Sequence, residues 1–140
     1  MHFFDEKTSK ILEKLTKNLD TKDSIHRFEE MEDASVLTVQ NIGNIWIGED
    51  SCSLFSIITS YNDDKQCKTP EIIVMRNEKR QWYPKAIGHN LKNTDESTDI
   101  VFYHETHKIT NFITDVIKKN ILYGALWLRI IAKKHNVSHT

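Results

Sequence analysis

The sequence predicts a single α+β domain, an antiparallel β-meander of four to five strands flanked by an N-terminal helix and a long C-terminal helix. Short runs of β-branched and aromatic residues, separated by Asn, Asp, Lys and Glu turns, occupy the middle of the chain. Apolar residues at helical spacing occupy both ends, and strands and helices do not alternate as a parallel sheet requires. At 140 residues the chain is long enough for one hydrophobic core, so residues 1–140 are expected to form one domain.

A first helix is expected over residues 5–19. Asp5 is a suitable N-cap, and the apolar residues that follow recur at helical spacing at Ile11, Leu12, Leu15 and Leu19. Residues 20–24 break the pattern. The next stretch, residues 25–31, places three apolar residues three apart among acids, which predicts a short helix or an ordered loop.

Strands are expected at residues 35–40, 54–61, 70–76, 81–87 and 99–103, with a loop at 48–51. The three central strands read as two hairpins end to end. Pairing Arg76 with Gln81 in the second hairpin defines two faces of the sheet. One face then carries Phe55, Ile57, Ile72, Val74, Tyr83 and Ile87, and the other carries Leu54, Ile58, Ile73, Met75, Trp82 and Pro84. Both faces are apolar, so either helices cover opposite faces or a partner covers one of them.

A last helix is expected from Thr110, as N-cap, to about His135. Over residues 121–132 it is apolar nearly all round, which is typical of a helix buried on more than one side. Either the first helix covers the second apolar stripe or a second subunit does. We expect a two-fold dimer, with an interface formed by Leu122, Ala125, Leu126 and Arg129.

The charges divide the chain unevenly. Residues 1–115 hold all 20 acids and 14 of the 19 basic residues, whereas residues 116–140 hold five basic residues and no acid. The basic end fits the dipole at the C-terminus of a helix, and it could also serve as a handle for an acidic partner. The acids fall in loops that flank the sheet, where they would repel phosphates. Direct nucleic-acid binding is therefore not expected, and a basic protein is the favoured partner.

No stretch carries a catalytic or cofactor motif. The phosphate-binding patterns GxxxxGK[ST] and GxGxxG are absent from the sequence. Cys52 and Cys67 fall too far apart in the predicted hairpin for a disulfide and have no context that would activate a thiol. His104, Glu105 and His107 follow a strand rather than share a helix face, so they do not make a metal site. We expect no catalytic residue, metal or cofactor, and the alternative is a small enzyme or ligand-binding domain with a pocket between the last helix and the sheet.

No signal peptide is recognisable at the start, and the apolar runs are too short to cross a membrane, so a cytoplasmic location is expected.

Several short motifs occur in a particular order along residues 35–135. They are Val39-Gln40-Asn41-Ile42-Gly43, Leu54–Tyr61 beginning Leu-Phe-Ser, Pro70-Glu71-Ile72-Ile73-Val74, Trp82-Tyr83-Pro84 and a helix with a central Trp127. In this order the chain resembles a small, uncharacterised domain family encoded on bacterial plasmids, phages and other mobile elements. The loops at 48–53 and 92–97 depart from that pattern. The resemblance implies an accessory protein of a mobile element and brings no catalytic residues with it.

These observations favour a non-catalytic protein-interaction domain, of which an inhibitor of a host defence system, such as a CRISPR-type system, is one instance. The residues expected to contact the partner are Trp46, Glu49, Asp50, Asp63, Asp64, Trp82 and Tyr83. The strand at Trp82-Tyr83-Pro84 is also expected to be central to folding, in which case its indole lies in the core rather than on a surface.

Overall fold

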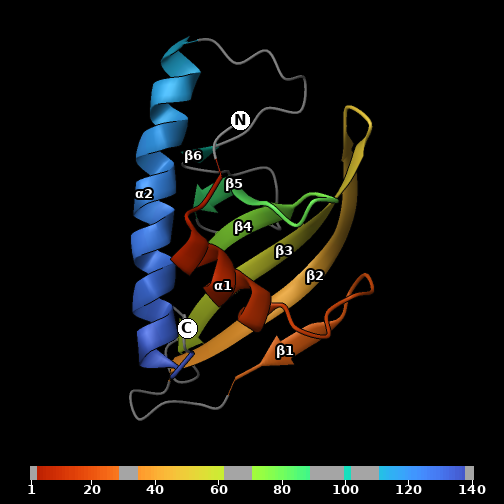
Figure 1. Ribbon diagram of the computed structural model, residues 1–140. Coiled ribbons are helices and arrows are strands. Elements are labelled where there is room, and N and C mark those ends of the chain that lie inside the picture. The colour runs from red at the N-terminus through yellow and green to blue at the C-terminus, as the bar shows by residue number, and fades with distance from the viewer. Residues whose placement is uncertain (1–2, 29–34, 62–70, 89–99, 102–110, 138–140) are drawn as a thin grey trace.

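The computed structural model describes residues 3–28, 35–61, 71–88, 100–101 and 111–137 (Figure 1). Within these ranges six antiparallel strands form one sheet in chain order, β1-β2-β3-β4-β5-β6. The elements are α1 (Glu6–Leu15), β1 (Ile25–Arg27), β2 (Ser35–Ile47), β3 (Asp50–Tyr61), β4 (Glu71–Arg76), β5 (Trp82–Gly88), β6 (Ile100–Val101) and α2 (Asn111–Lys134). The predicted α+β meander flanked by two helices is confirmed, and one short strand that was not predicted, β1, is added at one edge of the sheet.

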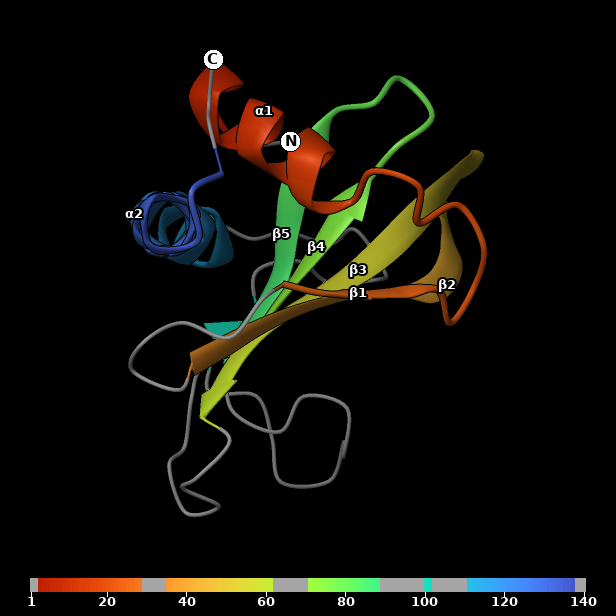
Figure 2. The ribbon, with the colours of Figure 1, turned by 90° about the horizontal axis from the view of Figure 1, so that it is seen from below.

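Both helices lie on the same side of the sheet (Figures 1 and 2). α1 crosses in front of the central strands and packs against α2, which also contacts β5. Asp5 caps α1 as predicted, since its Oδ1 accepts a hydrogen bond from the Thr8 backbone N–H at 2.9 Å. The two apolar sheet faces allow two explanations, a helix on each face or a partner on one face. Because both helices lie on the same side, the first explanation does not hold.

The two sheet faces are nevertheless both buried in the described strands. The side that faces the helices carries the buried residues Leu37, Val39, Phe55, Ile57, Ile72, Val74 and Trp82. The other side carries the buried residues Cys52, Leu54, Ile73, Met75 and Tyr83, and the Phe3 ring packs edge-on against Tyr83 with centroids 5.6 Å apart. Dense burial of both faces explains why the central strands are apolar at nearly every position.

The second hairpin differs from the predicted register by one residue. Arg76 pairs with Trp82 rather than with Gln81, because Asn77 belongs to the ladder and the turn contains only three residues. The Asn77 carboxamide fixes this turn by accepting from the Gln81 N–H at 2.8 Å, and Arg80 adopts a left-handed conformation with φ 60°. A one-residue slip exchanges the faces of a strand, so Trp82 faces the helices and Tyr83 the opposite side, the reverse of the prediction.

The first half of the sheet is longer than expected. β2 continues past residue 40, where the predicted strand ends, by means of a bulge between Asn41 and Gly43, and Gly43 has φ 117°. Gly48 and Glu49 form a two-residue turn, so the expected loop at 48–51 is instead the tip of a hairpin. Residues 25–27 form strand β1, which corrects the expectation of a helix or loop there. Backbone pairing with β2 outweighs the weak helical spacing of those residues.

Within the described residues, no helix is both long and apolar enough to cross a membrane. Cys52 is buried and free, and Cys67 lies outside the described residues.

Candidate interaction surfaces

The β2–β3 hairpin ends in a surface that we call the hairpin apex, formed by Trp46, Glu49, Asp50 and Glu78. Ile47 pairs with Asp50, so Gly48 and Glu49 make the turn, and Trp46 lies two residues before it, opposite Ser51. The hairpin extends past the region covered by α1 and α2 (Figure 1). The Trp46 side chain is consequently 71% exposed, the highest value among the large hydrophobic residues that the structure describes.

The apex is held in place by its neighbours. The Ser51 backbone N–H donates to Glu78 Oε1 at 3.2 Å, which ties the β4–β5 turn to the hairpin. Asn44 Nδ2 donates to Ser51 Oγ at 3.3 Å across the two strands. On the opposite side of the hairpin Ile47 and Cys52 are buried. The Trp46 indole is therefore exposed on one face of a hairpin whose other face is packed against the core.

The acids of the apex act on Cys52, which lies buried behind it. Burial raises the pKa of the Cys52 thiol, and the carboxylates of Asp50 and Glu78 raise it further. The Cys52 sulfur lies 3.0 Å from the Tyr83 hydroxyl. A buried thiol with a raised pKa is a poor nucleophile, so the acidic surroundings of Cys52 disfavour thiol chemistry.

Two of the predicted contact residues belong to the core instead. Trp82 and Tyr83 are each 1% exposed, because their strand lies between β4 and the N-terminal segment, whose Phe4 N–H donates to the Trp82 carbonyl at 2.8 Å. They cannot touch a partner, whereas the expectation that this strand is central to the core is confirmed. Asp63 and Asp64 lie outside the described residues.

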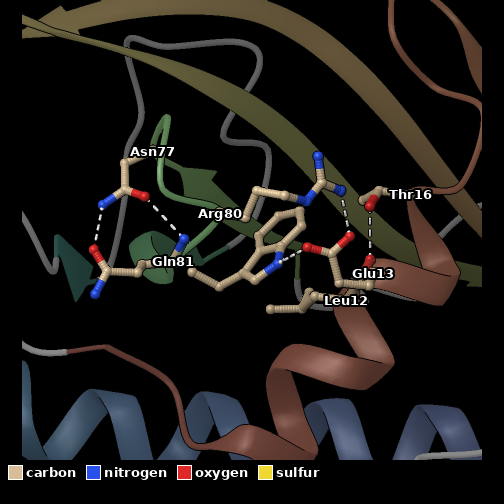
Figure 3. A network of polar contacts seen from close by, with 7 residues as sticks. Leu12, Glu13, Thr16, Asn77, Arg80 and Gln81 are labelled. Carbon is tan, nitrogen blue, oxygen red and sulfur yellow. Dashed lines mark hydrogen bonds and ion pairs between the residues drawn. The ribbon is translucent and has the colours of Figure 1, made fainter.

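The Trp82 indole takes part in a polar network beneath α1 (Figure 3). Its Nε1 donates to Glu13 Oε1 at 2.9 Å, and Arg80 Nη2 donates to Glu13 Oε2 at 2.5 Å. Burial alone raises the pKa of Glu13, but the hydrogen bonds from Arg80 and Trp82 outweigh it, and the pKa is lowered. Arg76 lies over the Phe55 and Trp82 rings, 5.3 and 5.4 Å from their centroids. This network fastens α1 to the sheet and presents no open site.

The outward side of α2 carries a second exposed surface, which we call the outer ridge: Leu122, Tyr123, Leu126 and Ile130. Their exposed fractions range from 56 to 68%, while Leu128, Ile131 and Ala132 on the opposite side are buried. Of the residues expected at a dimer interface, Leu122 and Leu126 lie on the ridge. Ala125 is buried within the chain, and Arg129 pairs with Asp5. The helix is thus apolar on two sides as predicted, and only one of them is covered by the described chain.

A cavity of about 340 Å³ lies between α1 and the C-terminal end of α2, which we call the interhelical cavity. It is lined by Lys7, Ile11, Arg129, Ala132, Lys133 and Val137. The alternative function expected a pocket between the last helix and the sheet, but this one lies between the two helices. The spacing of Lys7 and Ile11, and of Arg129 and Lys133, is the i, i+4 signal that could have indicated it.

In the part of the chain that the structure describes, no group of three His, Cys, Asp or Glu side chains is placed to hold a metal ion. His104, Glu105 and His107 lie outside those residues.

No family model matches the chain, and no curated protein or solved structure is similar to it. The resemblance to a mobile-element family accordingly stays a prediction, and the functional argument depends on the surfaces alone.

Proposed function

We propose that the chain is a non-catalytic protein-interaction domain that contacts its partner through the hairpin apex. The observation that carries the proposal is Trp46, a large aromatic side chain that is 71% exposed on a supported hairpin. Leaving an indole in water is unfavourable, and tryptophan is among the residues that contribute most to binding at protein interfaces.

The acids of the apex indicate the kind of partner. Glu49, Asp50 and Glu78 lie at the same end of the hairpin as Trp46, so a basic surface would be attracted to this end and a nucleic acid would be repelled. A basic, nucleic-acid-binding protein fits both features. If the chain is an accessory protein of a mobile element, as the resemblance implies, a component of a host defence system is one such partner.

The outer ridge of α2 supports self-association as a second property. Four large apolar side chains on one exposed helix face form a patch that a second copy could cover with its own ridge in a two-fold pair. The five basic residues of segment 116–140 oppose such pairing, because antiparallel α2 helices bring like charges together. The apolar contact must therefore exceed this repulsion.

A capture experiment from bacterial lysate tests the apex. The wild-type chain, Trp46→Ala and the control Ile25→Ala are immobilised side by side, since Ile25 is a half-exposed hydrophobic residue on the distant strand β1. We expect the wild type and the control to retain the same basic protein, and Trp46→Ala to bind it about thirtyfold more weakly or worse. The captured protein should be released as salt is raised.

Equal capture by Trp46→Ala would contradict the assignment of the apex. Substrate turnover by the purified chain would instead favour the enzyme alternative.

A further inference from the structure

The interhelical cavity differs in chemistry from both exposed surfaces. Its floor is apolar, since Ile11 and Ala132 are 1% and 2% exposed and Val137 is partly buried against the core. Its rim is cationic, formed by Lys7 on α1 and by Arg129 and Lys133 on α2. A ligand that suits this site needs an apolar part to cover the floor and a negatively charged part to meet the rim.

The wall contributed by Val137 is built by the end of α2. Asn136 adopts a left-handed conformation with φ 57°, which reverses the chain and brings Val137 back over the last turn. The Val137 N–H donates to the Ala132 carbonyl at 2.7 Å and the Asn136 N–H to the Lys133 carbonyl at 3.4 Å. These hydrogen bonds satisfy two of the carbonyl groups that a helix end leaves unpaired. The groups at this end that can attract a charged ligand are therefore the lysine and arginine side chains.

The charge on the rim is only partly neutralised. Asp5 Oδ2 accepts a hydrogen bond from Arg129, and the same carboxylate caps α1 through its other oxygen. Within the described residues no ion pair is found for Lys7 or Lys133, whereas Lys10, one turn further along α1, pairs with Glu6 at 3.4 Å. Two ammonium groups on facing helices thus border one apolar floor.

We infer that the interhelical cavity binds a small amphiphilic anion, a molecule with one carboxylate or phosphate head and a short hydrocarbon body. The body packs on Ile11, Ala132 and Val137, and the head lies between Lys7 and Lys133 with Arg129 beside it. The volume of about 340 Å³ is at the lower end of the range for ligand pockets, which matches a medium-length acyl chain rather than a nucleotide or a folded partner.

Titration calorimetry with a matched set of small molecules tests this inference. Octanoate and octyl phosphate carry both parts, octanol has only the body, acetate has only the head, and octylammonium reverses the charge. We expect the first two to bind and the other three to bind at least tenfold more weakly. A preference between octanoate and octyl phosphate identifies the head group, and the affinity should fall as salt is raised.

Three variants and a control locate the site. Lys7→Gln and Lys133→Gln should each lower the affinity for octanoate about threefold, because each removes one exposed charge contact. Val137→Phe should abolish binding by filling the cavity, and its melting temperature shows whether it remains folded. Lys10→Gln, on the same helix but outside the cavity, should leave the affinity unchanged.

The inference is overturned if octanol binds as well as octanoate, if none of the set binds, or if Lys7→Gln, Lys133→Gln and a folded Val137→Phe all bind octanoate like the wild type. Changes in the NMR chemical shifts of backbone amides near Val137 on adding octanoate would support the inference independently of the variants.

Discussion

At the scale of single residues, Trp82 connects the sheet to α1. Its indole is buried against Phe55, with ring centroids 5.5 Å apart, and donates to Glu13 across 69 positions of sequence. A tryptophan in an apolar strand is readily predicted to be buried. The direction of its side chain was not predictable in the same way, because it depends on the number of residues in the turn at Glu78–Arg80. Asn77 decides that number through a side-chain hydrogen bond that strand propensities do not contain.

Trp82→Ala should therefore destabilise the fold by about 3–5 kcal/mol, because it removes a fully buried indole and leaves a cavity beneath α1. Denaturant unfolding of the variant and the wild type measures the difference. A loss below about 1 kcal/mol would show that the indole is not part of the core in solution.

Glu13 should make stability depend on acid pH. Its pKa in the folded chain is lowered below the ordinary value of 4.5, so its contribution is complete above that value and is lost as the pH falls through the lowered pKa. The variant Glu13→Gln should be less stable than the wild type at neutral pH and should lose less stability on acidification. Unfolding curves at several pH values test this, with Glu6→Gln, from an exposed pair with Lys10, as the control. Parallel pH profiles for the wild type and Glu13→Gln would refute the assignment.

At the scale of elements, α2 shows what a periodicity argument can and cannot determine. The sequence indicated that residues 121–132 are apolar on more than one side, and the structure confirms it. Which side faces inward depends on how α2 lies against α1 and β5. The periodicity therefore predicts Ala125 at an interface, whereas in the structure Ala125 is buried inside the chain and the neighbouring Leu126 is exposed. Similarly, β1 depends on hydrogen bonds with β2 that its own three residues do not reveal.

Self-association through the outer ridge should be detectable by light scattering over a range of concentrations. We expect a dimer that strengthens as salt is raised, because salt screens the repulsion between the basic helix ends and leaves the apolar contact. Leu126→Ala should weaken it about tenfold, and Ile25→Ala should not change it. A monomer at every salt concentration, up to high micromolar protein, would exclude the dimer.

At the scale of the whole molecule, α2, which carries the outer ridge, and the tip of the β2–β3 hairpin, which carries the apex, lie at opposite sides (Figure 1). A basic partner at Trp46 and a second copy at α2 could therefore be bound at the same time. The sequence predicts the meander and the two helices because local patterns determine them, and it places Trp46, Glu49 and Asp50 among the candidate contact residues. It does not reveal Glu78 at the apex or the interhelical cavity, because both join segments that are distant in sequence and near only in the folded chain.

The attachment of α1 has a consequence for the order in which the chain folds. Asp5 pairs with Arg129, a residue 124 positions away, and Glu13 is held by Arg80 and Trp82, which are 67 and 69 positions away. α1 therefore leaves the ribosome well before the residues that fasten it to the rest of the fold. Until β5 and α2 have been synthesised, α1 lacks the polar contacts that fasten it and the helix that packs beside it, and contacts over such separations are typical of slow-folding chains. A nascent chain that stops before residue 129 should thus display Ile11, Leu12 and Leu15 to chaperones or to other chains.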